Sequence, residues 1–197
     1  TDADISTNAV AELTQTKAAS VSDMLRKLSE KNLVNYQKYQ GVRLTEAGEQ
    51  VALKVIRKHR LWEVFLVEKL GFNWDEVHDI AEQLEHIKSE KLITKLDEFL
   101  NFPTEDPHGD PIPNAEGQIV NIKKQLLSEF EKNRIGVCVG VKDTSSDFLK
   151  YLDKQEIALG SEIEVMEQES FDSSFRIRVG DKEMTISNKI ASNLFIK

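Results

Sequence analysis

The 197-residue chain holds a single cysteine and four prolines, and it lacks any apolar run long enough to span a membrane. A transmembrane helix needs about 20 consecutive apolar residues, so no segment is predicted to cross a bilayer. No secretory signal peptide is visible. One thiol excludes a disulfide within the chain, and Cys138, inside an apolar run, is expected to be buried and inert. We therefore infer a cytoplasmic protein.

The net charge of −8 is unevenly distributed along the chain. Residues 16–60 hold ten Lys and Arg against four Asp and Glu, whereas the remainder holds sixteen against thirty. A basic module attached to an acidic body suits electrostatic docking on DNA. A solvated basic face without a partner would give the same counts, so charge alone leaves both interpretations open.

The basic segment has the pattern of a winged helix-turn-helix. Apolar residues at helical spacing predict a short helix over 8–13 and a longer one over 17–30, which Asn32 should end. Alternating residues over 33–38 and 42–44 predict a β-ribbon. This order of elements is typical of a winged helix, and a generic helical hairpin is the alternative.

The first turns of the second helix are small and polar, which suits a helix N-terminus that enters the major groove. The residues expected to reach base edges are Lys17, Ala18, Ala19, Ser20, Ser22 and Asp23. Nearby basic side chains would contact phosphates, which position a protein without reading sequence. These are Arg26, Lys27, Lys38 and Arg43. We therefore predict binding to double-stranded DNA.

A helical region over 45–102 follows. Thr45 should cap a long helix that ends near Gly71, Asn73 should cap a second helix, and Ser89 a third. The second half of the long helix is apolar nearly all round, so it is buried or forms an interface. This much apolar surface suits a homodimer, whose twofold symmetry would match a palindromic operator.

Histidine and glutamate gather within this region. Four such residues share one face of the helix that Asn73 should cap: His78, Glu82, Glu85 and His86. On the preceding helix, His59 and Glu63 repeat the i, i+4 spacing. Ordinary surface pairs are the alternative to a metal site. Because three of the four histidines fall within 59–86, each within four residues of a glutamate, a divalent-metal site is favoured.

All four prolines lie between residues 103 and 113, which predicts a domain boundary and a semi-rigid linker. His108, isolated in this segment, is expected to be structural. Beyond it, short β-rich segments predict a small β-barrel. They are 134–141, 162–168, 175–179 and 183–186, with a helix near 146–152 and a hairpin turn at Gly180-Asp181.

Enzymatic activity is not predicted. The chain has no His-Glu-x-x-His, and the stretch Glu82-x-x-Glu85-His86 places glutamate where the inverted zinc motif needs histidine. No Ser or Cys nucleophile with a base partner is evident, so a metallohydrolase is a weak rival.

Three separated motifs, over 57–63, 77–86 and 108–113, resemble the diphtheria toxin repressor / manganese transport regulator family. The likeness covers essentially the whole chain, and the last part is similar to the FeoA-type barrel of longer members. The resemblance implies a homodimeric repressor of metal-uptake genes, activated by Mn²⁺ or Fe²⁺. A winged-helix regulator that binds DNA without metal, its His/Glu cluster being structural, is the alternative.

By position, the resemblance implies two metal sites. The ligands that match the family's primary site are Glu82, Glu85 and His86, and those that match its ancillary site are His59, Glu63 and His78. In the short manganese regulators the equivalent of His59 joins a binuclear site instead. A residue of the barrel can complete the ancillary site, and Asp143 or Asp147 falls near that position.

Two departures from the family pattern bear on the metal. Family members have an N-terminal helix that donates further primary-site ligands, and this chain opens at Thr1, after that helix, so the primary site is expected to be incomplete as written. Glu82 stands where the iron-responsive branch often has cysteine. The resulting carboxylate and imidazole set favours Mn²⁺ or Fe²⁺ over thiolate-selected metals.

The predicted fold is thus α+β, in four parts. They are a winged helix domain over 1–44, a helical dimerisation and metal-binding domain over 45–102, a Pro-rich linker over 103–125 and a FeoA/SH3-like barrel over 126–197.

Overall fold

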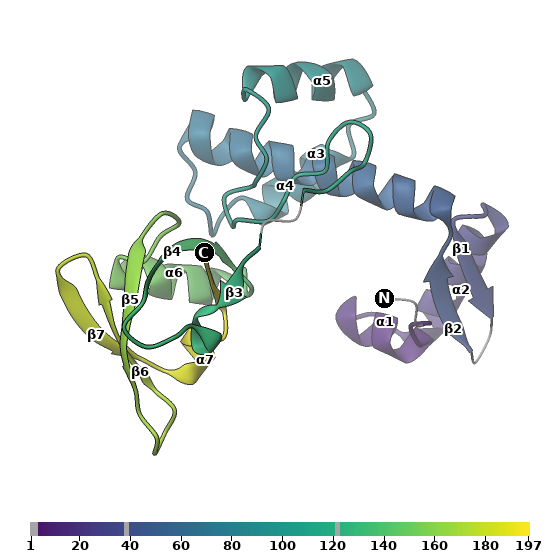
Figure 1. Cartoon of the computed structure of the whole chain (residues 1–197). Coiled ribbons are helices and arrows are strands. Elements are labelled where there is room, and N and C mark those ends of the chain that lie inside the picture. Colours follow the sequence, from purple (N-terminus) through teal and green to yellow (C-terminus); the bar gives the residue numbers. More distant parts are fainter. Residues whose placement is uncertain (1–3, 38–39, 121–122) are drawn as a thin grey trace. The chain divides into compact units, whose positions relative to one another are not determined.

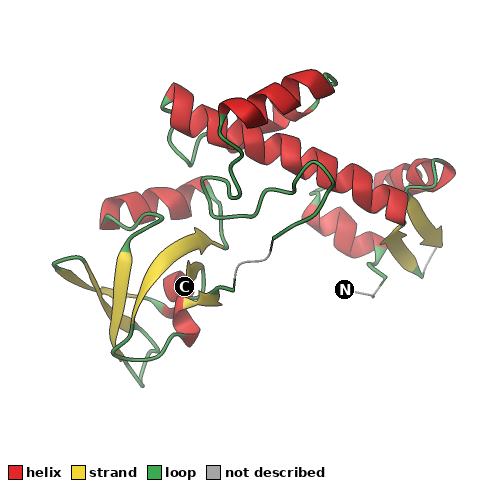
Figure 2. Cartoon of the chain, turned by 45° about the horizontal axis from the view of Figure 1, so that its top comes forward, coloured by secondary structure: helices red, strands yellow, loops and turns green. Residues whose placement is uncertain are grey.

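The structure is a computed structural model that describes residues 4–37, 40–120 and 123–197. The chain forms two compact units, Thr1–Ile56 and Arg57–Lys197 (Figure 1). Helices and strands are mixed along it (Figure 2), which confirms the predicted class. Among the described residues, no helix is both long enough and apolar enough to cross a membrane.

The described residues of the first unit form two complete helices, a two-stranded ribbon and the start of a third helix. α1 (Thr7–Leu13) and α2 (Ala18–Glu30) precede the antiparallel strands β1 (Val34–Gln37) and β2 (Gly41–Leu44). The hydroxyl of Ser6 accepts a hydrogen bond from the backbone of α1 and caps it. Apolar side chains from all four elements form a small core: Ala11, Val21, Leu25, Val34 and Val42. These elements confirm the predicted winged helix.

Local signals set the limits of the helices as predicted. Asn32, at φ 57°, follows the end of α2, and the left-handed conformation suits its short polar side chain. α3 (Glu46–Leu70) begins after Thr45, whose hydroxyl accepts from the N–H of Gly48 at 3.0 Å. It ends before Gly71, whose φ of 72° favours glycine.

In the second unit, α3 packs against two shorter helices. α4 (His78–Glu85) and α5 (Glu90–Phe99) follow it, and Ser89 caps α5 as predicted. The apolar faces of the three helices meet in one core, together with residues of the adjoining segments: Leu61, Trp62, Val64, Leu66, Val77, Ala81, Ile93, Leu96, Leu100 and Ile112. The apolar half of α3 is therefore buried in this core, which is one of the two predicted outcomes.

The prediction that Asn73 caps α4 is wrong, because α4 begins four residues later, after Val77. The carbonyl of Asn73 closes a turn instead, accepting from the N–H of Glu76 at 3.0 Å. The turn is held by contacts that Trp74 and Asp75 make with the sheet domain. Helical periodicity carries no information about such distant contacts.

Residues 103–113 fold back onto α3, unlike the semi-rigid linker that four prolines predict. Arg57 donates to the carbonyl of Pro113 at 2.6 Å, and Arg60 donates to the carbonyl of Pro111. Arg60 also lies 3.3 Å from the carboxylate of Asp106. The two arginines of α3 thus bind carbonyl groups of the proline segment and hold it in place.

The rest of the second unit is a six-stranded antiparallel sheet in the order β3-β8-β4-β5-β6-β7. The strands are β3 (Gln125–Leu126), β4 (Ile135–Val141), β5 (Glu162–Gln168), β6 (Phe175–Val179), β7 (Lys182–Ile186) and β8 (Leu194–Ile196). α6 (Ser146–Gln155) and the short α7 (Asn188–Ala191) accompany the sheet. Four strands, α6 and the Gly180-Asp181 turn confirm the predictions, whereas β3, β8 and α7 were not predicted. Cys138 lies in the core, as expected, and burial raises the pKa of its thiol.

Candidate metal centre and nucleic-acid interface

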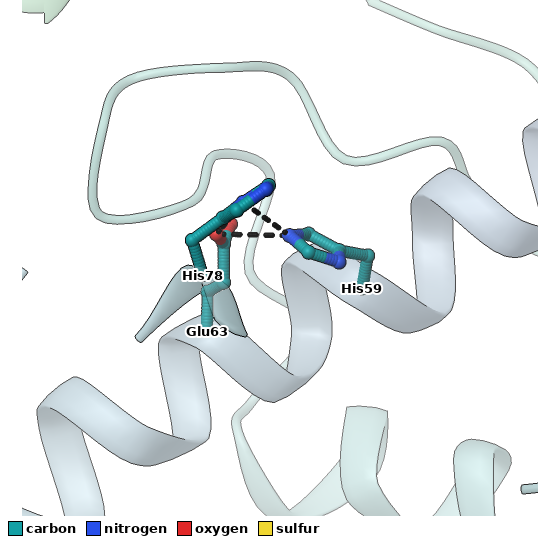
Figure 3. A group of neighbouring side chains, drawn as sticks. All are labelled: His59, Glu63 and His78. Atoms are coloured by element: carbon teal, nitrogen blue, oxygen red, sulfur yellow. Dashed lines mark hydrogen bonds and ion pairs between the residues drawn. The ribbon is translucent and has the colours of Figure 1, made fainter. Parts of the chain in front are cut away.

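Two imidazoles and one carboxylate converge between α3 and α4 (Figure 3). His59 and Glu63 lie one turn apart on α3, and His78 is the first residue of α4. His59 Nε2 is 3.0 Å from Glu63 Oε1 and 3.2 Å from His78 Nδ1. The distance from His78 Nδ1 to the same Glu63 oxygen is 3.6 Å. The ligand atoms therefore lie within 4.8 Å of one another, as a shared metal ion requires.

Glu63 also belongs to a second group, with Asp106 and His108 of the folded-back segment. His108 Nδ1 lies 3.8 Å from Glu63 Oε2 and 4.0 Å from Asp106 Oδ1. Glu63, Asp106 and His108 are only 3%, 6% and 4% exposed, whereas His78 of the first group is exposed. Glu63 thus offers one carboxylate oxygen to each group.

The two buried carboxyl groups ionise very differently. Burial opposes ionisation of Glu63, but the facing imidazoles of His108 and His59 outweigh it and lower its pKa to about 2. Burial raises the pKa of Asp106 to about 6, and the charge of Glu63 adds to this rise. Two backbone N–H groups that donate to Asp106, from His108 and Asp110, only partly oppose it.

The imidazoles of His59 and His108 each direct one ring nitrogen toward Glu63, and each donates a hydrogen bond from the other nitrogen to an outer acceptor. His59 Nδ1 donates to Glu85 Oε2 at 2.8 Å, and His108 Nε2 donates to the carbonyl of Trp74 at 2.8 Å. Burial would lower the pKa of both imidazoles, but the facing carboxylates outweigh it and raise both values. Outer partners of this kind fix the ring and tautomer of metal-binding histidines.

The donors of the two groups fit a divalent cation. They are two carboxylates and three imidazoles, a set without thiolate that suits Mn²⁺ or Fe²⁺. Burial is the main cause of the raised pKa of Asp106 and the charge of Glu63 adds to it; a cation beside both carboxylates would oppose both effects. Metal binding would also displace protons from His59 and His108.

The residues assigned to the primary site lie outside these two groups in the described part of the chain. Glu82 is exposed on α4, and His86 is exposed just after its last turn. The carboxylate of Glu85 instead bonds His59. The structure therefore links one expected primary ligand to an ancillary one.

The two candidate ligands from the sheet domain are also outside both groups, as far as the described residues extend. Asp143 accepts from the N–H of Ser145 at 2.9 Å, and this hydrogen bond lowers the pKa of Asp143. Asp147 is exposed in the first turn of α6. Asp143 thus precedes that helix, and Asp147 lies within it.

Sequence reasoning missed Asp106 and His108 as possible ligands, and it treated His108 as structural. The available signal was the Asp-Pro-His spacing in a segment that carries the fourth histidine of the chain. These residues follow Glu63 by more than forty positions, so only the fold brings them to it. Local spacing on one helix could not reveal the second group.

The start of α2 in the first unit borders an open groove of about 340 Å³. Its lining residues come from α1, α2 and the ribbon: Ser6, Thr7, Asn8, Ala18, Ala19, Ser22, Tyr36 and Gly41. Lys17 to Ser20 are exposed, while Ser22 and Asp23 are half-buried. The predicted base-reading residues thus share the accessible N-terminal part of one helix, which can enter a DNA groove.

Asp23 holds two of the predicted phosphate-contacting cations. Lys27 Nζ lies 2.8 Å from its carboxylate and Arg26 Nη2 lies 2.7 Å away, and their hydrogen bonds lower the pKa of Asp23. Arg43 on β2 lies 3.0 Å from a carboxylate of the N-terminal segment. Lys38 lies outside the described residues.

Three family models match the chain in succession. Residues 1–42 match the N-terminal DNA-binding domain of iron-dependent repressors, and residues 45–114 match their metal-binding and dimerisation domain. Residues 125–197 match the FeoA domain. The second match extends across the folded-back segment and therefore includes every member of both ligand groups.

Curated and structurally solved proteins resemble the chain in the same way. The iron-dependent repressor IdeR of Mycobacterium tuberculosis is 38% identical over 104 residues, which are 53% of this chain and 45% of that protein. The diphtheria toxin repressor of Corynebacterium jeikeium is 27% identical over 138 residues, 70% of this chain and 58% of that protein. The chain therefore spans about half the length of the curated relatives it matches.

A solved manganese-dependent transcriptional repressor in complex with manganese is similar over a much greater length. It has 34% sequence identity and a TM-score of 0.88, and the match covers 100% of this chain and 92% of that one.

Proposed function

The chain belongs to the family of metal-dependent repressors that includes IdeR and the diphtheria toxin repressor, and we propose that it represses transcription when it binds Mn²⁺ or Fe²⁺. The regulated genes would be those of metal uptake. The observation that carries the proposal is Glu63, whose two carboxylate oxygens face two separate sets of metal-binding side chains.

His59, Glu63 and His78 would hold one ion, and Glu63, Asp106 and His108 would hold a second or share the first. The bound metal would supply positive charge that neutralises the two buried carboxylates and draws the three imidazoles together. Glu82, Glu85 and His86 stay candidate ligands of a further site, as does Asp143 or Asp147 from the sheet domain. We expect a non-catalytic role, because the family models that match residues 1–42 and 45–114 are those of DNA-binding repressors.

α3 provides the physical link between metal and DNA. It begins in the DNA-binding unit and carries His59 and Glu63 within the second unit. Bound metal would favour the arrangement of the two units that suits an operator. The shift in this equilibrium can be no larger than the difference between the metal's affinity for that arrangement and its affinity for the others. In a homodimer, two α2 helices about 34 Å apart would meet successive major-groove faces of a palindromic site.

The first test is capture of genomic DNA fragments by the full chain, with Mn²⁺ and then with excess chelator. We expect specific fragments to be retained only with metal, because the metal-loaded form would be the one that binds DNA. In the cell this would take place in the cytoplasm. Retention in both conditions would identify a metal-independent winged-helix regulator. Failure to retain DNA in either condition would contradict the proposal.

The Glu63→Gln variant tests the metal centre itself. It keeps the size of the side chain but removes the charge that both ligand groups share, so metal-dependent capture should be lost. Glu68→Gln is the matched control, because Glu68 lies five residues further along α3, is exposed and belongs to neither group. Equal Mn²⁺ dependence in both variants would exclude Glu63 as a ligand.

A further inference from the structure

The turn before α4 contacts both the buried ligand group and the sheet domain. The carbonyl of Trp74 accepts the Nε2–H of His108, and the indole stacks on the same imidazole with ring centroids 6.3 Å apart and planes at 12°. On its other side, the indole Nε1–H donates to Asp153 Oδ1 of α6 at 3.0 Å. One residue thus joins a candidate metal ligand to a helix of the sheet domain.

The neighbouring residue binds the same helix. The Asp75 side chain is only 3% exposed, and it accepts from the hydroxyl of Ser146 at 3.0 Å. Its carboxylate also lies 3.3 Å from Lys150 Nζ. Ser146, Lys150 and Asp153 are four and three residues apart, so they share one face of α6. The turn over 74–75 therefore holds α6 along two turns of that face.

His108 is also fixed to the sheet through its backbone. Its carbonyl accepts from the N–H of Val141 on β4 at 2.9 Å. Gly109 adopts φ +81°, and a Cβ there would lie 2.0 Å from the carbonyl oxygen of Val139. The segment that carries His108 therefore packs directly on the backbone of β4, which fixes the backbone of His108, while the contacts with Trp74 orient its imidazole.

We propose that Trp74 is a positioning residue of the metal centre, which holds His108 with Nδ1 toward Glu63 and Asp106 and, through Asp153, couples metal binding to the attachment of the sheet domain. The inference rests on the proposed function, because it takes the groups around Glu63 to be the metal centre. With its Nε2–H bonded to a carbonyl, His108 keeps its Nδ1 lone pair available for a cation.

Coupling of this kind acts in both directions. If metal requires the orientation of His108 that Trp74 imposes, contacts that fix Trp74 raise metal affinity. By linkage, bound metal strengthens the contacts between Trp74 and α6 by the same free energy. A residue that only fills space between two domains would change stability without changing metal affinity.

The experiment measures Mn²⁺ affinity of the full chain by calorimetry, with Asp153→Ala as the main variant. Loss of the acceptor for the indole should weaken Mn²⁺ binding about 10- to 100-fold, the usual effect of removing an outer partner. Asp153→Asn keeps an oxygen acceptor and should restore most of the affinity. Lys154→Ala, at the next exposed position of α6, is the matched control.

Two further readouts follow the sheet domain and the indole. Hydrogen exchange in residues 146–155 should slow on addition of Mn²⁺ in the unchanged chain but not in Asp153→Ala. Replacing the only other tryptophan, Trp62→Phe, leaves Trp74 as the single indole. Among the described residues, Trp62 Nε1 has no hydrogen-bond partner, so this replacement removes no hydrogen bond. Mn²⁺ should then change Trp74 fluorescence with the affinity found by calorimetry.

The outcomes separate this inference from the proposed function. If Glu63→Gln abolishes Mn²⁺ binding while Asp153→Ala binds Mn²⁺ as the unchanged chain does, the metal centre stands and the coupling is overturned. Lower thermal stability of Asp153→Ala with unchanged Mn²⁺ affinity would likewise reduce Trp74 to a packing residue. Mn²⁺ binding that survives Glu63→Gln would contradict the proposed metal centre itself.

Discussion

Nδ1 of His59 lies 2.8 Å from Oε2 of Glu85, so that a carboxylate on α4 holds an imidazole on α3 whose other nitrogen faces Glu63. The resemblance to known repressors places Glu85 among the ligands of a separate primary site. In this structure its carboxylate orients His59. The two roles have different consequences for substitution, because an orienting group needs only a hydrogen-bond acceptor, whereas a ligand contributes charge.

Glu85→Ala should therefore weaken Mn²⁺ binding at the Glu63 centre about 10- to 100-fold, since His59 loses the partner that fixes its ring. Glu85→Gln retains an oxygen acceptor and should lose far less. Calorimetric Mn²⁺ titrations of both variants make the comparison, with Gln83→Ala on the exposed side of α4 as control. If Glu85→Gln is as damaging as Glu85→Ala, the charge of Glu85 matters and it acts as a direct ligand.

Mn²⁺ affinity should rise with pH between about 5.5 and 7.5. The metal-free centre binds protons more tightly than isolated side chains do, because the pKa of Asp106 is raised to about 6 and the pKa values of His59 and His108 are raised as well. Each displaced proton adds up to about tenfold in affinity per pH unit. Calorimetry in buffers of different ionisation enthalpy counts the released protons, and a pH-independent affinity would contradict the proposed ligand set.

The raised pKa of Asp106 also predicts how the metal-free protein responds to pH. A carboxyl group with a folded-state pKa above its ordinary 3.8 stabilises the fold at low pH, and this contribution is lost as pH rises through about 6. The Asp106→Asn variant lacks this titrating group. Its free energy of unfolding, compared with that of the unchanged chain, should therefore rise by about 1–3 kcal/mol from pH 4.5 to pH 7.5. Denaturation with chelator present measures it, and an equal difference at both pH values would contradict the expectation.

Much of the fold could be predicted because its signals are local. Thr45 and Gly71 mark the ends of α3 through cap chemistry, and alternation places β5 and β6 to the residue. The i, i+4 spacing of His59 and Glu63 likewise identifies one face of α3 without any knowledge of the rest. Helical periodicity and capping act within a few residues, and the sequence displays them directly.

The remaining features depend on contacts between distant segments. The second ligand group forms because Arg57 and Arg60 bind carbonyl groups of the proline segment, which brings Asp106 and His108 to Glu63. Proline content alone indicates an extended spacer, because it reports only the local stiffness of the chain. It does not reveal that distant arginines bind the carbonyl groups of the proline segment. The failed prediction of a cap at Asn73 has the same origin, in contacts between the following turn and the sheet domain.

On the DNA-binding unit, Asp23 is the residue whose removal gives the clearest prediction. Its carboxylate pairs with both Arg26 and Lys27 on α2. Asp23→Asn should free both cations for phosphates, so that affinity for non-specific DNA rises and the dependence of log affinity on log salt steepens by about one to two units. Ser29→Asn, at an uncharged position further along α2, is the control.

Fluorescence anisotropy with random and operator duplexes at several salt concentrations makes the measurement. A steeper slope on both duplexes would show that Asp23 moderates backbone contacts, whereas a loss confined to the operator would show that it reads a base edge and contradict this prediction.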